Sequence, residues 1–213
     1  MTPGPRSPSE GGGPGDRDPL QAYRTMLARY RGTLDLLSPA AYEDLDRLLA
    51  EADRYAAAVA ELAGDEGPVL DLGTGAGLPG VVVAARLDPR AVWWIERRRR
   101  RAAFLSQVAA RAGLGAVRVF DRDVRYVERP AGGVAAVTAQ AVGELAGIAE
   151  LTRHLWGPRV VLVSRKGPDW RAEVERMDAW GSRAQAPWVR ARVLREEPLG
   201  TRGTLVAVEV RGG

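Results

Sequence analysis

Apolar residues recur along the chain with two different periods, and the change between them predicts the order of helices and strands. Spacings of three and four residues predict two amphipathic helices, over residues 19–37 and 39–63. After them, short apolar runs typical of buried strands alternate with helical segments. The expected strands are 69–72, 91–95, 116–120, 134–138 and 160–163, and the expected helices are 78–87, about 102–113, 143–155 and 169–180.

Alternation of strands with helices is typical of α/β proteins that contain a parallel sheet. Two further apolar runs, at residues 189–194 and 203–210, are joined through Pro198, Gly200 and Gly203. These runs predict an antiparallel hairpin at the end of the chain. The pattern as a whole therefore predicts a mostly parallel sheet of seven strands.

Composition divides the chain into a tail, a helical segment and a core. Residues 1–18 carry Pro, Gly, Ser and charge with almost no apolar side chain, so we expect them to be disordered. Residues 19–63 form a predicted N-terminal helical cap, and residues 64–213 are long enough for one α/β domain. The absence of cysteine excludes disulfides and thiolate metal sites, and we expect no bound metal. Without an apolar segment of membrane-spanning length, we expect a cytoplasmic protein, monomeric and not associated with membranes.

The stretch from Val69 to Gly80 predicts a strand, a glycine turn and the start of a helix. Glycines allow positive φ and a close approach of the backbone to a ligand, and they stand here at Gly73, Gly75 and Gly77. Such a turn indicates a nucleoside cofactor. Counting from Gly75 also gives the G-x-G-x-x-G spacing of nicotinamide-binding sites. The Asp71 carboxylate would repel a pyrophosphate but can meet the ammonium group of S-adenosylmethionine (SAM), which favours SAM. An NAD-dependent dehydrogenase and a tight turn without any ligand stay as minor alternatives.

Glu96 ends the second predicted strand, about 20 residues beyond the glycines. An acidic residue at this place holds the ribose hydroxyls in nucleoside-binding βαβ units. We therefore predict that Glu96 binds the ribose of the cofactor. The alternative is a solvated acid that pairs with the arginines that follow it.

Positive charge is concentrated in arginine. All but one of the 31 basic residues are Arg, the single lysine is Lys166, and the net charge is +4. Five consecutive arginines, Arg97 to Arg101, follow Glu96 at an edge where open α/β sheets bind ligands. Arg98, Arg99 and Arg100 are predicted to clamp the phosphate backbone of RNA, and the alternative is a solvated start of a helix.

The segment LDLGTGAGLPGVVVAARLDPRAVWWIERRRRRAAFLSQVAARAGL resembles the core of the RsmG (GidB) family, the bacterial 16S ribosomal RNA guanine-N7 methyltransferases. Its most distinctive part is the Gly-Leu-Pro-Gly at residues 77–80, and the resemblance extends from about Val69 to Glu209. It implies a Rossmann-like, class I SAM-dependent methyltransferase whose N-terminal helices pack over the cofactor end of the sheet. It also implies SAM as cofactor and 16S rRNA, or the small ribosomal subunit, as partner.

The resemblance implies a role for each residue that matches the family's motifs. The implied cofactor-binding residues are Asp71, Gly73, Gly75, Gly77, Leu78, Glu96, Val124, Arg125 and Gln140. Gln140 and Lys166 are the implied catalytic residues that face the reacting base, and Lys166 joins Arg98 to Arg100 as an RNA-binding residue. Guanine N7 carries an exposed lone pair, so its methylation needs positioning rather than a base that removes a proton.

The chain also departs from the family in places that bear on activity. Gln140 stands where the family has an active-site arginine, and Asp123-Val124-Arg125 reverses the charges of the usual Arg-Val/Ala-Glu, which can be the same ion pair made the other way round. The family's His-x-x-Asp-Ser-Leu stretch is missing around Leu49 to Tyr55. Two alternatives therefore stay open: a methyltransferase-like RNA- or ribosome-binding protein that has lost catalysis, and a SAM-dependent enzyme that acts on a small molecule.

Overall fold

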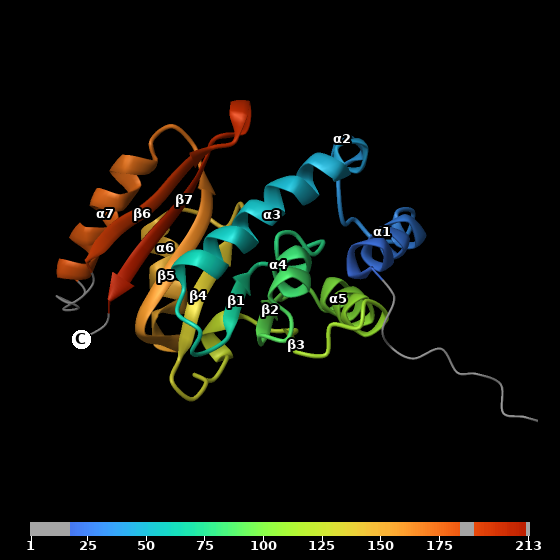
Figure 1. The fold of residues 1–213 in the computed structure, drawn as a ribbon, viewed down its shortest axis with the longest axis horizontal. Coiled ribbons are helices and arrows are strands. Elements are labelled where there is room, and N and C mark those ends of the chain that lie inside the picture. Colours follow the sequence, from blue (N-terminus) through green and yellow to red (C-terminus); the bar gives the residue numbers. More distant parts are fainter. Residues whose placement is uncertain (1–17, 184–189, 212–213) are drawn as a thin grey trace, which may run out of the picture.

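A computed structural model describes residues 18–183 and 190–211, and in them a seven-stranded sheet separates two layers of helices (Figure 1). The strand order is β3-β2-β1-β4-β5-β7-β6. The first five strands in the chain are parallel, and β7 is antiparallel to both of its neighbours. The strands are β1 (Val69–Leu72), β2 (Val92–Ile95), β3 (Val117–Phe120), β4 (Val134–Ala139), β5 (Trp156–Lys166), β6 (Ala191–Pro198) and β7 (Thr204–Arg211). The predicted mostly parallel sheet and its terminal hairpin are confirmed.

Helices cover both faces of the sheet (Figure 1). One layer contains α1 (Pro19–Tyr30), α3 (Leu45–Leu62), α4 (Gly80–Leu87) and α5 (Arg99–Arg111). The other contains α6 (Leu145–Thr152) and α7 (Trp170–Arg183). The remaining helical segments are short: α2 (Pro39–Glu43), η1 (Val124–Tyr126), η2 (Arg153–Leu155) and η3 (Gly200–Arg202). None of the described helices is long and apolar enough to cross a membrane.

The parallel strands are buried on both faces, as expected for a sheet covered by helices on each side. In β1 all four residues are buried, with Val69 in the core under α3 and α4 and Leu70 and Leu72 in the core under α6 and α7. Side chains of successive strand residues point to opposite faces. Asp71 therefore lies on the α3 and α4 side of β1, a placement that bears on its role below.

The two predicted N-terminal helices are shorter than their apolar spacing indicated. The first ends at Tyr30, and the second is divided at Asp44 into α2 and α3. Ser38 caps α2, since its Oγ accepts a hydrogen bond from the Ala41 N–H at 3.2 Å. The Asp18 carboxylate accepts from the Leu20 N–H at 2.9 Å and caps α1, so the described end of the predicted disordered segment belongs to a helix. The rest of that segment, and Val189 of the predicted hairpin, lie outside the described residues.

The first of the two long N-terminal helices reaches the glycine turn. The Tyr23 hydroxyl of α1 donates a hydrogen bond to the Ala76 carbonyl oxygen at 3.0 Å. The longer helix, α3, runs across the face of the sheet beside α4 and contacts β5 and β7 (Figure 1). Most of the apolar face of α3 therefore covers the central core.

Strand β5 is longer than its apolar run, because it includes Gly157, Pro158 and Arg159 before the buried stretch. Its pairing with β4 is irregular there, with a register shift between Val134 and Ala136. The backbones approach closely at this point: a Cβ on Gly133 would lie 2.3 Å from the Gly157 nitrogen. The irregular pairing explains why apolar alternation did not predict the first part of the strand.

Candidate functional site

A cavity of about 430 Å³ opens at the carboxyl ends of β1, β2 and β4. This is the edge at which open α/β sheets bind ligands. Strand ends, the glycine turn and the two loops after β3 and β4 form its wall. The lining residues are Leu72, Gly73, Gly75, Ile95, Glu96, Arg97, Arg98, Arg101, Arg122, Asp123, Val124, Gln140, Ala141, Val142 and Leu151.

The glycine turn forms the floor of the cavity in a conformation that suits glycine. Gly73 has φ 71° and Gly75 has φ 60°, a region that costs other L-residues about 1 kcal/mol or more. A Cβ on Gly73 would also lie 3.1 Å from Val142 Cγ2, across the cavity wall. Two of the predicted glycines therefore leave their backbone open to a ligand.

Glu96 joins the end of β2 to this turn. Its Oε2 accepts a hydrogen bond from the Gly75 N–H at 3.1 Å, and its Oε1 accepts from the Arg98 N–H at 2.7 Å. The carboxylate is buried, with 6% of the residue exposed, yet it lines the cavity. Each carboxylate oxygen can accept a second hydrogen bond. Glu96 is thus fixed in position with acceptor capacity left on the cavity side.

The loop between β4 and α6 brings Gln140, Ala141 and Val142 to the opposite wall. Ala141 has φ 57°, the one positive value at a non-glycine position in the described part of the chain. Backbone strain of this kind costs about 1–3 kcal/mol and occurs most often at functional sites. Gln140 places an uncharged amide at the cavity, with both a donor and an acceptor.

Asp71 lies under the glycine turn, and it is not among the residues that line the cavity. Its Oδ1 accepts a hydrogen bond from the Thr138 hydroxyl at 2.6 Å, while its Oδ2 accepts no hydrogen bond of regular geometry from the described residues. A Cβ on Gly80 would lie 2.5 Å from that Oδ2, so α4 begins directly against the carboxylate. Burial raises the pKa of Asp71 to about 6, and the hydrogen bond from Thr138 opposes this shift.

The loop after β3 contributes Val124, which is buried in η1 and lines the cavity. Asp123 caps η1 and forms an ion pair with Arg125, whose Nη2 lies 2.8 Å from Asp123 Oδ2. This hydrogen-bonded guanidinium lowers the pKa of Asp123 to about 2. The structure therefore contains an ion pair between the two positions where the chain reverses the family's charges. Arg125 itself, a predicted cofactor-binding residue, is not among the residues that line the cavity.

Arginines from the segments after β2 and β3 line one side of the cavity. Arg97, Arg98, Arg101 and Arg122 are part of its wall. A neighbouring cavity of about 320 Å³ is lined by Arg98 to Arg101 and by Thr33, Leu34 and Asp35. All three predicted RNA-binding arginines lie there, at the edge of the sheet. Arg101 is partly fixed, since it donates a hydrogen bond to the Asp35 carbonyl.

Lys166 is not brought to the cavity. Its Nζ lies 2.9 Å from Glu173 Oε2 and donates a hydrogen bond to the Gly143 carbonyl, and the side chain is 4% exposed. Glu173 Oε2 also accepts from the Leu145 N–H at 3.0 Å. The lysine therefore ties the end of β5 to α7 and to the start of α6. Direct contact with a base or with RNA would require this arrangement to open, and both roles stay predictions.

Five of the residues predicted to bind the cofactor line one cavity: Gly73, Gly75, Glu96, Val124 and Gln140. Gly77 instead packs under α1, where a Cβ would lie 2.9 Å from Val81 Cγ2 and 3.0 Å from Tyr23 Cε2, and Leu78 lies outside the lining.

Other residues of the site were missed, and three of them differ in how they could have been found. Thr138 holds Asp71, and nothing in its local sequence indicates this. Ile95 and Leu72 line the cavity because they end their strands, which the predicted strand limits already implied.

A family model described as rRNA small subunit methyltransferase G, GidB, matches residues 16–191. The curated relatives include ribosomal RNA small subunit methyltransferase G of Cupriavidus necator, 33% identical over 183 residues that cover 81% of this chain and 77% of the relative. The protein of the same name from Beutenbergia cavernae is 35% identical over 153 residues, which cover 72% of this chain and 70% of the relative.

Solved structures with the same fold are more distant in sequence. A SAM-dependent methyltransferase from Aquifex aeolicus has a TM-score of 0.56 at 16% identity, covering 92% of this chain and 100% of that one. TYW2 of M. jannaschii, solved with AdoMet, has a TM-score of 0.60 at 16% identity, covering 85% of this chain and 78% of that one. At this identity they establish a shared Rossmann-like fold. The family match over most of the sequence goes further: the chain belongs to the rRNA small subunit methyltransferase G (GidB) family.

Proposed function

We propose that this protein transfers a methyl group from SAM to N7 of a guanine in the rRNA of the small ribosomal subunit. The observation that carries the proposal is the cavity at the ends of β1 and β2. There the buried Glu96 carboxylate meets two positive-φ glycines, in a chain that belongs to this family. Its volume of about 430 Å³ lies within the range of about 300–1,000 Å³ usual for small-molecule sites.

Residues that line the cavity fit SAM by their chemistry. Glu96 would accept hydrogen bonds from the ribose hydroxyls, and Val124 would give the adenine an apolar neighbour. Gly73 and Gly75 would let the backbone approach the methionine end. Asp71 would act from beneath the turn, by holding its backbone and contributing negative charge near the ammonium group. When bound, SAM supplies a methyl group on a positively charged sulfur.

The composition of the cavity wall favours N7 over other methyl acceptors. The described residues that line it include no His, Lys, Ser, Thr or Tyr, and Glu96 and Asp123 are already hydrogen-bonded. A hydroxyl or exocyclic amine must lose a proton on methylation, whereas the N7 lone pair is free to react. These residues can therefore contribute by orientation alone. Gln140 would hold the guanine through its amide, which donates and accepts hydrogen bonds.

The arginines of this cavity and of the neighbouring one, Arg97 to Arg101 and Arg122, would bind phosphates next to the target base. The partner would be 16S rRNA or the assembled small subunit, and the site of action the cytoplasm, where the subunit is assembled.

The proposal is tested with radiolabelled SAM and small ribosomal subunits that lack the modification. We expect label in the rRNA, recovered as 7-methylguanosine after digestion to nucleosides. Glu96→Gln should weaken SAM binding by about 10–100-fold, because a hydrogen bond to a charged group contributes about 1.5–3 kcal/mol. Glu175→Gln, a change of an exposed carboxylate on α7, is the matched control and should bind SAM normally.

Other results would favour other functions. RNA binding without label would favour a family member that has lost catalysis, which the neutral Gln140 at the cavity makes the main alternative. Label in neither RNA nor the subunit, with SAM still bound, would favour a small-molecule substrate. Label on an atom other than N7 would contradict the argument from the cavity wall.

A further inference from the structure

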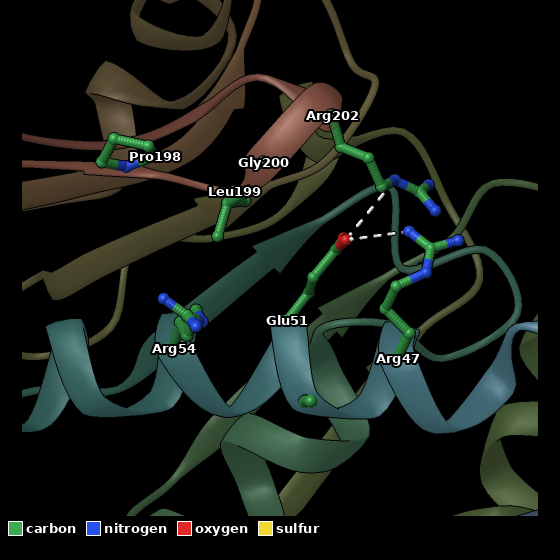
Figure 2. A pocket seen from close by; sticks show the side chains of 8 residues that line it. Arg47, Glu51, Arg54, Pro198, Leu199, Gly200 and Arg202 are labelled. Atoms are coloured by element: carbon green, nitrogen blue, oxygen red, sulfur yellow. Dashed lines mark hydrogen bonds and ion pairs between the residues drawn. The ribbon is translucent and has the colours of Figure 1, made fainter.

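A second cavity, of about 550 Å³, lies between α3 and the turn that joins β6 to β7 (Figure 2). Its charged lining residues are Arg47, Glu51, Arg54 and Arg202, and Pro198, Leu199 and Gly200 complete the wall on the side of the hairpin. We call Arg47, Arg54 and Arg202 the arginine groove. None of the roles proposed above uses it.

Glu51 forms the floor of this groove and is surrounded by positive charge. Its Oε1 lies 3.3 Å from Arg47 Nη1 and 3.4 Å from Arg202 Nε, and its Oε2 lies 3.3 Å from Arg165 Nη1. Figure 2 shows Arg47 and Arg202 converging on this one carboxylate from α3 and from η3. One negative charge therefore faces three guanidinium groups.

The carboxylates that pair with the groove arginines do not balance the positive charge around Glu51. Arg54 pairs with Glu197, and Arg47 also pairs with Asp44. The four arginines that meet here thus face three carboxylates. The contacts to Glu51 are longer than the roughly 2.7–2.9 Å of a strong charge-assisted hydrogen bond, and each guanidinium has five N–H donors. The groove therefore keeps donors for an additional anion.

These donors are accessible to a ligand. The side chains of Arg47, Arg54 and Arg202 are 43%, 48% and 31% exposed, whereas Glu51 below them is 12% exposed. An anion that approaches from solvent meets guanidinium groups before it meets the carboxylate. Paired guanidiniums match the oxygens of a phosphate in geometry as well as in charge.

The groove lies at the same edge of the sheet as the cavity of about 430 Å³ that we propose to bind SAM, called the cofactor cavity below. Thr204, the first residue of β7, pairs with Lys166 at the end of β5 and with Pro198 at the end of β6. The turn with Arg202 therefore stands beside the carboxyl end of β5. Only β5 separates β7 from β4, and the end of β4 lines the cofactor cavity. At a strand spacing of about 4.8 Å, β7 and β4 are about 10 Å apart. A polynucleotide with one base in the cofactor cavity can reach the groove.

We propose that the arginine groove binds a backbone phosphate of the RNA substrate, near the methylated guanine. This inference rests on the proposed function and adds a second point of attachment on the side of β5 away from Arg98 to Arg100. Contact on both sides of the cavity would fix the direction of the strand as well as its position.

The test compares two double variants that remove the same charge. Arg47→Gln/Arg54→Gln changes the groove, and Arg86→Gln/Arg195→Gln removes two arginines that pair with Asp53 and Glu61 on other parts of α3. Binding to small-subunit rRNA is measured at several salt concentrations, with SAM affinity and urea unfolding as folding controls. Each lost phosphate contact lowers the slope of log affinity against log salt by about 0.7–0.9. We expect the groove variant, which loses one phosphate contact, to lose about 0.7–0.9 in slope and about 10-fold in affinity, and the control variant to match the wild type.

Equal slopes for the groove variant and the wild type, with methyl transfer by the wild type intact, would contradict RNA binding by the arginine groove. The proposed function would still hold. Equal losses in both double variants would also contradict RNA binding by the groove, since they would show an effect of net charge alone. If inorganic phosphate stabilises the wild type but not the groove variant, while their RNA slopes agree, the groove binds a small phosphate ligand and the RNA assignment is wrong. A wild type that neither binds nor methylates rRNA would instead contradict the proposed function.

Discussion

At the scale of single residues, Asp71 combines full burial with an incomplete set of hydrogen bonds. Burial raises its pKa from 3.8 to about 6, so the folded protein holds the proton more tightly than the unfolded chain does. This contribution to stability is complete below pH 4 and is lost as the pH rises through about 6. The difference amounts to about 3 kcal/mol, at about 1.4 kcal/mol for each unit of pKa. We predict that Asp71→Asn, which cannot ionise, gains stability relative to the wild type by about this amount between pH 4 and pH 7.

Urea unfolding of both proteins at pH 4, 5, 6 and 7 measures that change. Asp121→Asn, a substitution of an exposed carboxylate, serves as the control and should follow the wild type at every pH. Parallel stability curves for the wild type and Asp71→Asn would mean that Asp71 ionises in the folded protein as it does in the unfolded one. Loss of SAM binding in Asp71→Asn would separately support the electrostatic role given to this carboxylate.

At the scale of secondary-structure elements, the ion pair between Lys166 and Glu173 holds the loop that forms one wall of the cavity. Lys166 binds the Gly143 carbonyl, and Glu173 accepts from the N–H of Leu145 at the start of α6. Removal of one partner from a buried pair costs about 3–5 kcal/mol. We predict that Lys166→Met loses about 3 kcal/mol of unfolding free energy and binds SAM more weakly, because Gln140 to Val142 lose their support.

A second variant separates positioning from catalysis. In Lys166→Met/Glu173→Gln the uncompensated charge is gone, and the glutamine can still accept from Leu145. If Lys166 only positions the loop, this double variant should regain most of the stability, the SAM affinity and the methyl transfer. Recovery of stability and SAM affinity without methyl transfer would instead establish the lysine as a residue that contacts the reacting base.

These contacts show which parts of the site a single sequence can predict. Gly73, Gly75 and Glu96 lie next to strand ends that the apolar pattern defines, so their meeting follows from one local βαβ unit. Asp71 could have been placed beneath the turn from strand periodicity, because Leu72 beside it faces the cavity. The partners Thr138 and Glu173 come from distant segments, and neither spacing nor composition indicates that they meet.

The same distinction explains the limits of the fold prediction. The mostly parallel sheet followed from the alternation of strands and helices, and the terminal hairpin followed from two apolar runs joined through Pro and Gly. Helix ends instead depended on tertiary packing. Apolar spacing continues past Tyr30, where α1 ends, and across Asp44, where α2 gives way to α3. The arginine groove joins α3 to the hairpin, segments that are about 150 residues apart in the sequence. Its arginines could not be singled out from the sequence, because arginine is abundant throughout the chain.

At the scale of the whole molecule, a ligand in the cofactor cavity would touch segments from distant parts of the chain at once. The wall includes the ends of β1 and β2, the loops after β3 and β4, and Leu151 of α6. Binding there should therefore stabilise the fold as a whole.

A ligand that binds only the folded protein stabilises it by about 2.7 kcal/mol at 100 times its Kd. At about 2–4 °C for each kcal/mol, we predict that SAM at that excess raises the Tm by about 5–11 °C. The demethylated product, S-adenosylhomocysteine, should give a comparable shift because it presents the same nucleoside to Glu96 and Val124. NAD serves as the negative control and should give no shift, because the Asp71 carboxylate would repel its pyrophosphate. A shift with NAD and none with SAM would replace the methyltransferase assignment with a dinucleotide site.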